Sequence, residues 1–580
     1  MIKILKHLKW YEWLLIMFIF ALTVLEVQCD LKLPEYMVKI LSSIGSGTEE
    51  VWKNGGMIML FVLASVAISI VISYTSSRIA SGFSKRLRGL VFNKVGEFSM
   101  NEVNKFSTAS LITRSTNDIS QVQNVLTMIL RMFMYAPVMA VSALIKITSI
   151  NATLSWTTFA FVLIMFVFVV VVMLLVFRKF MKMQKQTDEL NSVARENLTG
   201  IRVVRANNSE KYEQEKFTNV NNKLTSTSLF VNRVTAFLFP FMQLLMNGLN
   251  LALYWIGASL LLNPDVSINF LQISEFSQYS IEVVMSFLFI NILFILVPRG
   301  SVSARRINEV LSTETTVKNG TLKPEQTESV GTVKFNHVSF KYPGADEYVL
   351  KDISFEAKQG ETVAFIGSTG SGKSTLINLV SRFYDATSGE VLVDGINIKD
   401  YKFSALNDRL GYIPQKSLLF SGTVKENVCY GAPDATDEQI EKALEISQSK
   451  EFVDKLDGRL DYVVAQGGNN FSGGQKQRLS IARAIIKNPE ILIFDDSFSA
   501  LDYKTDKILR KKLKESFSNV TKLIVAQRIG TIMDADKIIV LEDGNIVGEG
   551  THEQLLNSCD VYKSIALSQL SEEELTNGTK

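Results

Sequence analysis

Six long apolar stretches lie in the first half of the chain, and they constrain its fold more than any other feature. A helix that crosses the hydrocarbon core of a bilayer needs about 20 mostly apolar residues. The six stretches that approach or exceed this length are Trp13–Val27, Met57–Ser73, Val125–Ile150, Leu154–Phe177, Val234–Leu262 and Tyr279–Val297. The chain is therefore predicted to contain a membrane domain of six helices.

The first stretch has a second interpretation, because three lysines precede it as in a secretory signal peptide. These are Lys3, Lys6 and Lys9. A cleavage site would need small residues after the apolar run, whereas Glu26 and Gln28 stand there. The pattern favours an uncleaved first membrane helix.

Basic residues indicate how the helices are oriented. The segments after the second and fourth stretches are rich in Lys and Arg, whereas the turns "TSINATLS" and "LLNPDVSINFLQIS" contain neither. Positively charged loops stay on the cytoplasmic side. Both termini and both long basic segments are therefore predicted to face the cytoplasm.

The two basic segments are long, mixed in charge and poor in Gly and Pro. They are either solvated loops or, as we favour, helical hairpins that extend the membrane helices and contact the soluble half. In that case stretches such as Asn207–Phe217 form the contact tips.

A polar stretch, "STETTVKNGTLKPEQTESV", separates the apolar half from a soluble half in which short strands alternate with helices. The predicted division is residues 1–311 for the membrane domain, 312–331 for a linker, 332–567 for an α/β domain and 568–580 for a flexible tail. The net charge of +3 is too small to favour a nucleic-acid partner. The three scattered cysteines exclude a disulfide framework.

A strand, a glycine-rich loop and an amphipathic helix follow one another in "TVAFIGSTGSGKSTLINLV". Their loop satisfies the phosphate-loop pattern, in which backbone N–H groups surround phosphate oxygens. The predicted ATP-binding residues are Gly367, Ser368, Thr369, Gly370, Ser371, Gly372, Lys373, Ser374 and Thr375. Lys373 is expected to neutralise the phosphates, and the Ser374 hydroxyl to bind Mg²⁺.

Two residues outside this loop are weaker candidates for the same site. Tyr342 lies in a turn before the strand and could stack on adenine or could be packing only. Gln415 follows a short strand in "GYIPQKS" and is a plausible ligand for the metal and for water.

A second glycine-rich helix start, "NNFSGGQKQRLSIARAII", is more specific. Its residues Ser472, Gly473, Gly474 and Gln475 begin a helix and are suited to bind an anion. One nucleotide cannot easily occupy two helix starts about a hundred residues apart in one lobe. The predicted solution is that this segment clamps a nucleotide held by another chain.

Taken in order, "GSTGSGKST", "YIPQ", "NFSGGQKQR", "ILIFDD" and "SALD" resemble the motifs of half-transporters of the ATP-binding-cassette exporter family. The resemblance covers the chain from the first apolar stretch to about Leu567. It implies six membrane helices with long cytoplasmic extensions, fused to an α/β phosphate-loop ATPase domain. It also implies a dimer that sandwiches two ATP molecules with Mg²⁺, with Asp502 of "SALD" in the loop between the two sites.

Two positions depart from the family pattern. Asp495 matches the carboxylate that holds Mg²⁺, but Asp496 stands where these exporters usually have a glutamate that polarises water. One methylene fewer draws the carboxylate back by more than about 1 Å, and a positioned base contributes roughly 10²–10⁴-fold in rate. Gln527 occupies the place of the family's switch histidine and cannot become cationic. Harmless drift would have to affect both positions and spare the ATP-binding loop.

These departures predict a heterodimer, as in the heterodimeric multidrug exporters of the family. A second, non-identical half-transporter would bring the glutamate and histidine, and Ser472–Gln475 would complete its site. The expected setting is a bacterial plasma membrane, with the ATPase domain in the cytoplasm. A different class stays open, a non-hydrolysing ATP-bound regulator, although the intact "SGGQ" argues against it.

The expected substrate is a small amphipathic molecule such as a drug, with lipid or peptide as the alternative. Polar residues inside membrane spans are functional candidates, and those of the last two spans are Asn247, Asn250, Glu282 and Asn291. Hydrogen bonding between packed helices is an equally good role for them.

Overall fold

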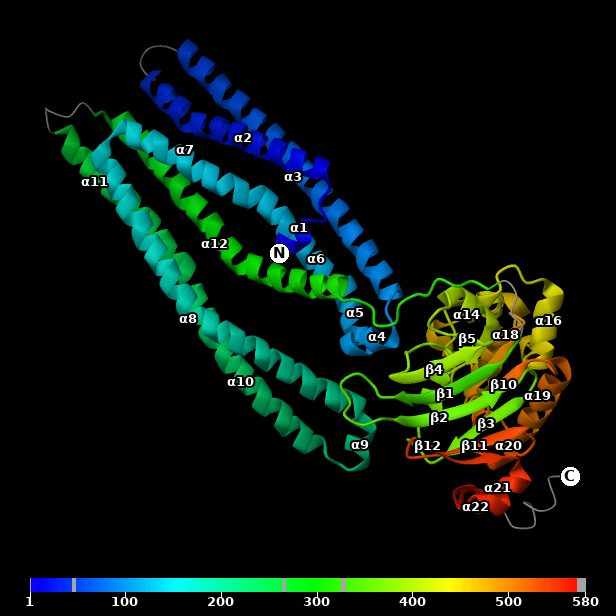
Figure 1. The fold of residues 1–580 in the computed structure, drawn as a ribbon. Helices are drawn as coiled ribbons and strands as arrows, with labels where there is room; N and C mark the ends of the chain where they lie inside the picture. The colour runs from blue at the N-terminus through cyan, green and yellow to red at the C-terminus, as the bar shows by residue number, and fades with distance from the viewer. Residues whose placement is uncertain (1, 44–47, 263–267, 325–329, 571–580) are drawn as a thin grey trace. The chain divides into compact units, whose positions relative to one another are not determined.

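In the computed structural model, residues 2–43, 48–262, 268–324 and 330–570 are described (Figure 1). The chain divides into two compact units. The membrane unit comprises Met1–Val95 and Ala109–Ser312, and the ATPase unit comprises Gly96–Thr108 and Thr313–Lys580. The expected fold class is confirmed: long apolar helices are followed by an α/β domain.

The described residues of the membrane unit form helices joined by short connections. Its helices are α1 (Ile2–Leu5), α2 (Trp10–Ser43), α3 (Thr48–Gly96), α5 (Thr108–Ser115), α6 (Asn117–Met128), η1 (Ile129–Phe133), α7 (Met134–Ile150), α8 (Ala152–Thr199), α9 (Ile201–Ala206), α10 (Glu210–Ala236), α11 (Leu238–Leu261) and α12 (Phe270–Ser312). Of these, η1 is a short π-helix between α6 and α7.

Five helical stretches of the described residues are long and apolar enough to cross a membrane. They contain the first five predicted spans. The sixth predicted span lies within α12, where the side chains of residues 291–296, including Asn291, are outside the described residues.

The membrane helices continue far beyond the length that a bilayer requires. The 48 residues of α8 extend for about 72 Å at 1.5 Å per residue, against a hydrocarbon core of about 30 Å. The predicted helical hairpin is therefore present, with α8 and α10 packed along each other (Figure 1).

The tip of this hairpin lies a few residues earlier than predicted. The chain reverses between Gly200 and Ser209, around the short helix α9, and residues 210–217 already belong to α10. Asn208 makes the reversal possible, because it adopts a φ of 51°, a left-handed conformation that Asn tolerates. The predicted tip Asn207–Phe217 is thus only partly correct.

The ATPase unit contains three sheets. Their orders are β2-β1-β4-β5, β12-β11-β3-β10-β9-β6 and β7-β8. The strands are β1 (Val333–Phe340), β2 (Leu350–Ala357), β3 (Thr362–Gly367), β4 (Ser388–Val393), β5 (Ile396–Asn397), β6 (Leu410–Ile413), β7 (Gly422–Thr423), β8 (Val463–Val464), β9 (Ile491–Asp495), β10 (Thr521–Val525), β11 (Lys537–Glu542) and β12 (Asn545–Gly550).

Helices cover these sheets. They are α4 (Met100–Phe106), α13 (Lys373–Val380), α14 (Phe403–Arg409), α15 (Val424–Val428), η2 (Cys429–Gly431), α16 (Asp437–Ile446), α17 (Lys450–Val453), η3 (Arg459–Asp461), η4 (Gln466–Gly468), α18 (Gly473–Ile485), α19 (Tyr503–Ser516), α20 (Ile529–Ile532), α21 (His552–Ser558) and α22 (Asp560–Leu567).

The six-stranded sheet positions the site. Strand β10 pairs in parallel with β3 on one side and with β9 on the other. Parallel strands of this kind are buried on both faces, and every residue of β9 and β10 is buried. The carboxyl ends of the three strands therefore meet at one edge of the sheet, where ligands of open α/β sheets bind.

Three segments pack on the ATPase unit in ways that the sequence did not indicate. The first is α4, which lies in the sequence between two spans. Its Asn104 amide donates to the Tyr384 hydroxyl at 3.1 Å. The carboxylate of Glu102 accepts from the Thr316 backbone N–H at 3.2 Å.

The second segment is the predicted linker. The backbone N–H groups of Thr321 and Leu322 donate to the carbonyl of Asp400 at 3.0 and 2.9 Å, and Arg382 donates to the carbonyl of Lys318 at 2.7 Å. These described residues of the linker are therefore anchored to the α/β fold.

The third segment is the start of the predicted tail. The side-chain amide of Gln569 donates to the carbonyl of Gln527 at 2.7 Å and accepts from the N–H of Ile529 at 2.8 Å. Gln569 is therefore hydrogen-bonded to the residues directly before and after Arg528. Residues 527–529, which begin with Gln527 at the position of the family's switch histidine, are called the switch segment below. Residues 571–580 lie outside the described residues.

Candidate functional site

The loop between β3 and α13 has the backbone of a phosphate cradle. A side chain at Gly367 would place its Cβ 2.0 Å from the carbonyl oxygen of Leu541, so only glycine fits there. Gly372, which caps α13, has a φ of 99°, in the region that favours glycine. The structure therefore places residues 367–375 in a glycine-dependent loop and at the N-terminus of α13, where an anion can bind, and their contact with ATP stays a prediction.

Lys373 is the cation of this cradle. Its side chain is only 8% exposed, and its ammonium donates to the carbonyl oxygens of Gly367 at 2.9 Å and Ser368 at 2.6 Å. Burial lowers the pKa of Lys373. Phosphate oxygens brought into the loop would restore the solvation that the ammonium has lost.

Ser374 and Asp495, the two predicted Mg²⁺ ligands, meet at the end of the sheet. The Ser374 hydroxyl donates to Oδ1 of Asp495 at 2.8 Å, and burial is the largest cause of a raised pKa at Asp495. A hydroxyl and a carboxylate side by side fit Mg²⁺, which prefers oxygen ligands and keeps several for phosphate and water. Ser374 and Asp495 are thus the residues that would hold Mg²⁺, and the ion would supply positive charge next to the phosphate loop.

Asp496 is held by two amides. Its Oδ2 accepts from Gln527 Nε2 at 3.0 Å and from Gln415 Nε2 at 3.3 Å. The residue is 8% exposed and has a φ of 50°, and burial is the largest cause of its raised pKa. Gln415 therefore turns its NH₂ group toward Asp496, and its predicted role as a metal ligand stays a prediction.

Tyr342 lies next to the phosphate loop. Its hydroxyl is 3.0 Å from the Thr375 hydroxyl, and its ring packs edge-on against Phe340 and Tyr384. The contacts define the ring's position beside α13, and adenine stacking stays a prediction.

Ser472–Gln475 form a capping box at the start of α18. The Ser472 hydroxyl accepts from the Gln475 backbone N–H, and the Gln475 side chain accepts from the Ser472 N–H at 2.8 Å. A Cβ added at Gly473 would meet open space. Among the described contacts of this segment, none reaches Lys373 or Ser374, and its predicted role at a nucleotide held by another chain stays a prediction.

Asp502 is the N-cap of α19. Its Oδ1 accepts from the Thr505 backbone N–H at 3.0 Å, which is the first cause of its lowered pKa. In this chain the carboxylate therefore has a structural role, and its predicted place between two nucleotide sites stays a prediction.

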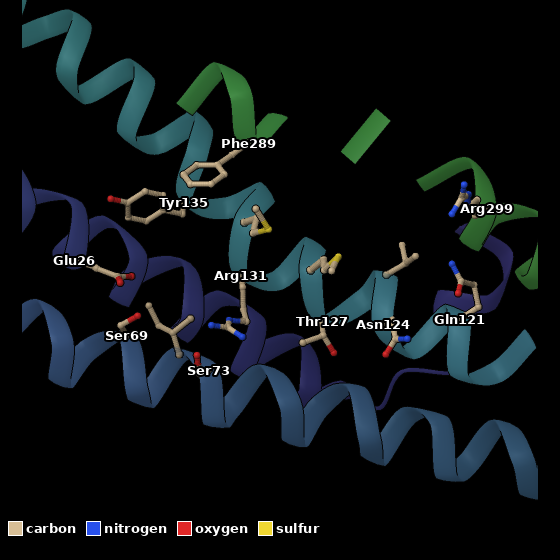
Figure 2. A pocket seen from close by; sticks show the side chains of 14 residues that line it. Glu26, Ser69, Ser73, Gln121, Asn124, Thr127, Arg131, Tyr135, Phe289 and Arg299 are labelled. Atoms are coloured by element: carbon tan, nitrogen blue, oxygen red, sulfur yellow. The ribbon is translucent and has the colours of Figure 1, made fainter. Parts of the chain in front are cut away.

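The membrane unit contains a cavity of about 830 Å³ between α2, α3, the α6–η1–α7 stretch and α12 (Figure 2). Its wall is mixed. The polar and charged members are Glu26, Ser69, Ser73, Gln121, Asn124, Thr127, Arg131, Tyr135 and Arg299, and the apolar members are Ile72, Val125, Met128, Met132 and Phe289.

Four residues were predicted as cavity candidates, and the side chain of one of them, Asn291, lies outside the described residues. Among the described residues, Asn247, Asn250 and Glu282 do not line the cavity. Asn250 instead accepts from the Ser277 hydroxyl at 2.6 Å, a contact between packed helices. Glu26 and Arg131 were overlooked, although a charged residue inside an apolar span is a sufficient signal.

Both halves match known families. Residues 15–295 match the ABC transporter transmembrane region, and residues 350–499 match the ABC transporter model. An uncharacterized ABC transporter ATP-binding protein of Mycobacterium tuberculosis is 39% identical over 570 residues, with 97% of each chain covered.

Two further relatives carry descriptions of a substrate. The ATP-dependent lipid A-core flippase of Mannheimia succiniciproducens is 30% identical and covers 89% of this chain and 87% of its own length. The probable multidrug resistance ABC transporter ATP-binding/permease protein YheI of Bacillus subtilis is 31% identical, with 87% and 86% covered.

A solved structure of a bacterial Atm1-family ABC exporter with ATP bound aligns with a TM-score of 0.80 at 22% identity. It covers 97% of this chain and 98% of that one, and so shows the same fold from end to end. The expected membrane location is confirmed with it. Together with the matches over both halves, this likeness shows that the chain belongs to the ABC transporter family, as an ATP-driven exporter half-transporter that fuses its membrane domain to its ATPase.

Proposed function

We propose that this chain is the degenerate-site half of a heterodimeric exporter of small amphipathic molecules. The observation that carries the proposal is the engagement of Asp496 by Gln527 and Gln415. A general base must reach the proton of the attacking water within about 2.6–3.2 Å. Here the carboxylate is one methylene short, and one of its oxygens already accepts two amide N–H groups.

ATP binding and ATP hydrolysis are thus separated in this chain. The cradle of Lys373, with Ser374 and Asp495 at its edge, retains the groups that bind MgATP. Its hydrolytic groups are weakened. On this proposal the chain's own site retains ATP and stabilises the closed dimer, a ligand effect on a two-state equilibrium.

The partner is proposed to be a second, non-identical half-transporter with a glutamate and a histidine at the positions of Asp496 and Gln527. The exposed capping box of Ser472–Gln475 would complete its site from across the interface. Its glycines and helix N-terminus suit a γ-phosphate.

The substrate class rests on the membrane cavity. Its wall combines methionine and phenylalanine side chains with Glu26 and Arg131 (Figure 2), which suits a molecule with an apolar body and a polar or charged group. The multidrug relative supports drug export. The lipid A-core flippase supports a lipid as the second candidate, since a lipid is amphipathic as well.

ATPase measurements on the purified chain, with and without its partner, test whether this chain only retains ATP while the partner's site hydrolyses it. The chain alone should hydrolyse ATP slowly although it binds MgATP, and the pair should be fast. Rapid turnover by the chain alone, abolished in Asp496→Asn, would refute the proposal. A non-hydrolysing regulator, by contrast, predicts a pair whose turnover does not depend on Ser472.

A further inference from the structure

A second pocket lies in the ATPase unit, away from the phosphate loop. It has a volume of about 390 Å³ and is walled by α19, β10 and the α20 region. This volume is at the small end of the range for ligand sites. The pocket is not used by ATP binding as described above.

The wall of this pocket is strongly basic. Lys507, Lys511 and Lys514 recur at spacings of four and three residues, which places them on one face of α19. In the part of the chain that the structure describes, Lys507 and Lys514 have no carboxylate within 4.0 Å, and the nearest one to Lys511 is Glu515 at 4.0 Å. A face of this kind alone would be an ordinary solvated surface.

A fourth lysine makes the pocket different from such a surface. Lys522 also lines the pocket but is only 6% exposed. Its ammonium donates to the carbonyl oxygens of Phe517 at 2.6 Å and Val520 at 2.9 Å, which uses two of its three N–H groups. Burial lowers the pKa of Lys522 to about 8, so a nearby anion would favour its charged form.

The acidic groups of the wall do not neutralise these lysines. Asp534 lies at 3.8 Å from Arg510, whose guanidinium also binds Asp506 at 3.1 Å. Among the residues described, Arg510 is the basic group of the wall with two acidic partners, and Lys511 has only the 4.0 Å contact with Glu515. The lysines remain as an excess of positive charge.

Part of the remaining wall is apolar and accessible. The ring of Tyr503, which is 59% exposed, and the half-buried Met533 provide this surface, and the buried side chains of Phe494, Phe498 and Leu513 lie behind it. An inorganic anion would leave this surface in contact with water, whereas an anion with an apolar body would cover it.

We propose that this pocket binds a small organic anion. Its carboxylate, sulfonate or phosphate ester would contact the lysines, and its apolar body would cover the apolar part of the wall. The inference needs only the ATPase unit and does not rest on the proposed heterodimer. Phe494 directly precedes Asp495, and Gly530 and Thr531 follow Gln527. Phe494 is buried, so a bound anion acts on the segment of Asp495 through packing, and it contacts the segment after Gln527 at Gly530. It alters ATP turnover by stabilising one arrangement of these segments.

The test uses the full-length protein in lipid nanodiscs, with excess MgADP so that the phosphate loop is saturated. Binding of 1-naphthoate is measured by calorimetry for wild type and for the combined variant Lys507→Gln, Lys511→Gln and Lys514→Gln. We expect affinity to fall by about tenfold or more in the variant, because charge-assisted hydrogen bonds are lost. The matched control, Lys504→Gln, lies on the same helix outside the pocket and should bind as wild type does.

Three comparisons test whether binding depends on the negative charge, on the lysines and on the source of the anion. Naphthalene-1-methanol, the neutral analogue, should bind much more weakly than 1-naphthoate, and equal affinity would overturn the proposal. Unchanged affinity in the triple variant would overturn it as well.

Decyl phosphate, free in solution, and nanodiscs that contain phosphatidic acid distinguish a soluble ligand from a lipid headgroup. Displacement of 1-naphthoate by either supports the pocket and names the source, and displacement by neither overturns it for phosphate esters. Thermal unfolding without ligand checks that the variants are folded.

Discussion

The side-chain amide of Gln527 donates a hydrogen bond of 3.0 Å to Oδ2 of Asp496. Since Gln415 donates to the same oxygen, both lone pairs of Oδ2 are used within the protein. The two departures from the family pattern are therefore in contact. A histidine in place of Gln527 would be able to carry a positive charge, and a glutamate in place of Asp496 would reach about 1 Å farther.

Restoring both groups should restore hydrolysis. We expect the double variant Asp496→Glu, Gln527→His to hydrolyse ATP at least about tenfold faster than the unmodified chain, because a positioned base contributes roughly 10²–10⁴-fold. Steady-state phosphate release at saturating ATP measures this. The paired control is Asp496→Asn, which should leave the low rate of the unmodified chain unchanged. If the control abolished a substantial rate, Asp496 would be a working base.

Ser472 should matter to the partner's site and not to its own. In the assembled pair, Ser472→Ala should reduce ATP turnover by about tenfold or more while this chain's affinity for ATP stays the same. Loss of an N-cap also costs about 1 kcal/mol of stability, so a matched control is needed.

Thr436→Ala provides that control, since Thr436 forms the same kind of capping box with Gln439 at the start of α16. It should lose similar stability and keep full turnover. Equal turnover in the two variants would argue that Ser472 only caps its helix.

Tyr342 should contribute to ATP affinity through its ring. Tyr342→Ala is expected to weaken ATP binding by about 5- to 150-fold, in line with roughly 1–3 kcal/mol for a stacked base. Tyr342→Phe loses only the contact with Thr375 and should bind ATP within a few-fold of wild type. Dissociation constants for ATP, measured by calorimetry with Mg²⁺, show whether the ring or the hydroxyl of Tyr342 contributes to the affinity. Equal losses in both variants would assign the effect to the hydroxyl.

Lys522 should make stability depend on pH. Its folded pKa of about 8 lies below the ordinary value of 10.5, so between these values the unfolded chain binds more protons than the folded one. The free energy of unfolding therefore rises with pH across this window, and the cost of the buried ammonium is fully present below pH 8. Asp536 and Lys514 are the charged groups that act on it.

Lys522→Met removes this ionisation. The melting temperature of the wild type, relative to this variant, should increase from pH 8 to pH 10.5. A constant difference over that range would contradict the assignment.

Arg131 should take part in substrate recognition. It lines the membrane cavity from the π-helix η1, in the same wall as Glu26. Arg131→Gln should change the transport of charged amphipathic dyes into inverted vesicles by about tenfold. Lys146→Gln, on α7 and outside the cavity wall, should leave transport unchanged. If Lys146→Gln altered transport and Arg131→Gln did not, the cavity would not be the substrate site.

Much of the site could be predicted from local patterns. Glycines at fixed spacing before Lys373 indicate a phosphate loop because only their backbone conformations bring N–H groups together. The apolar run before Asp495 indicates a buried strand. The spans and the helical extensions likewise follow from runs of residues that are contiguous in the chain.

The sequence by itself therefore determined the order of domains, the phosphate loop and the shortened carboxylate of Asp496. The tertiary structure alone decided what surrounds them: Gln415 and Gln527 on the same carboxylate oxygen, Gln569 on the switch segment, α4 packed in the ATPase unit and Arg131 in a cavity wall. The physical reason is that strands, loops and membrane spans arise from interactions among near neighbours and with solvent or lipid. Contacts between distant residues depend on how complete elements pack, and no short-range pattern records that packing.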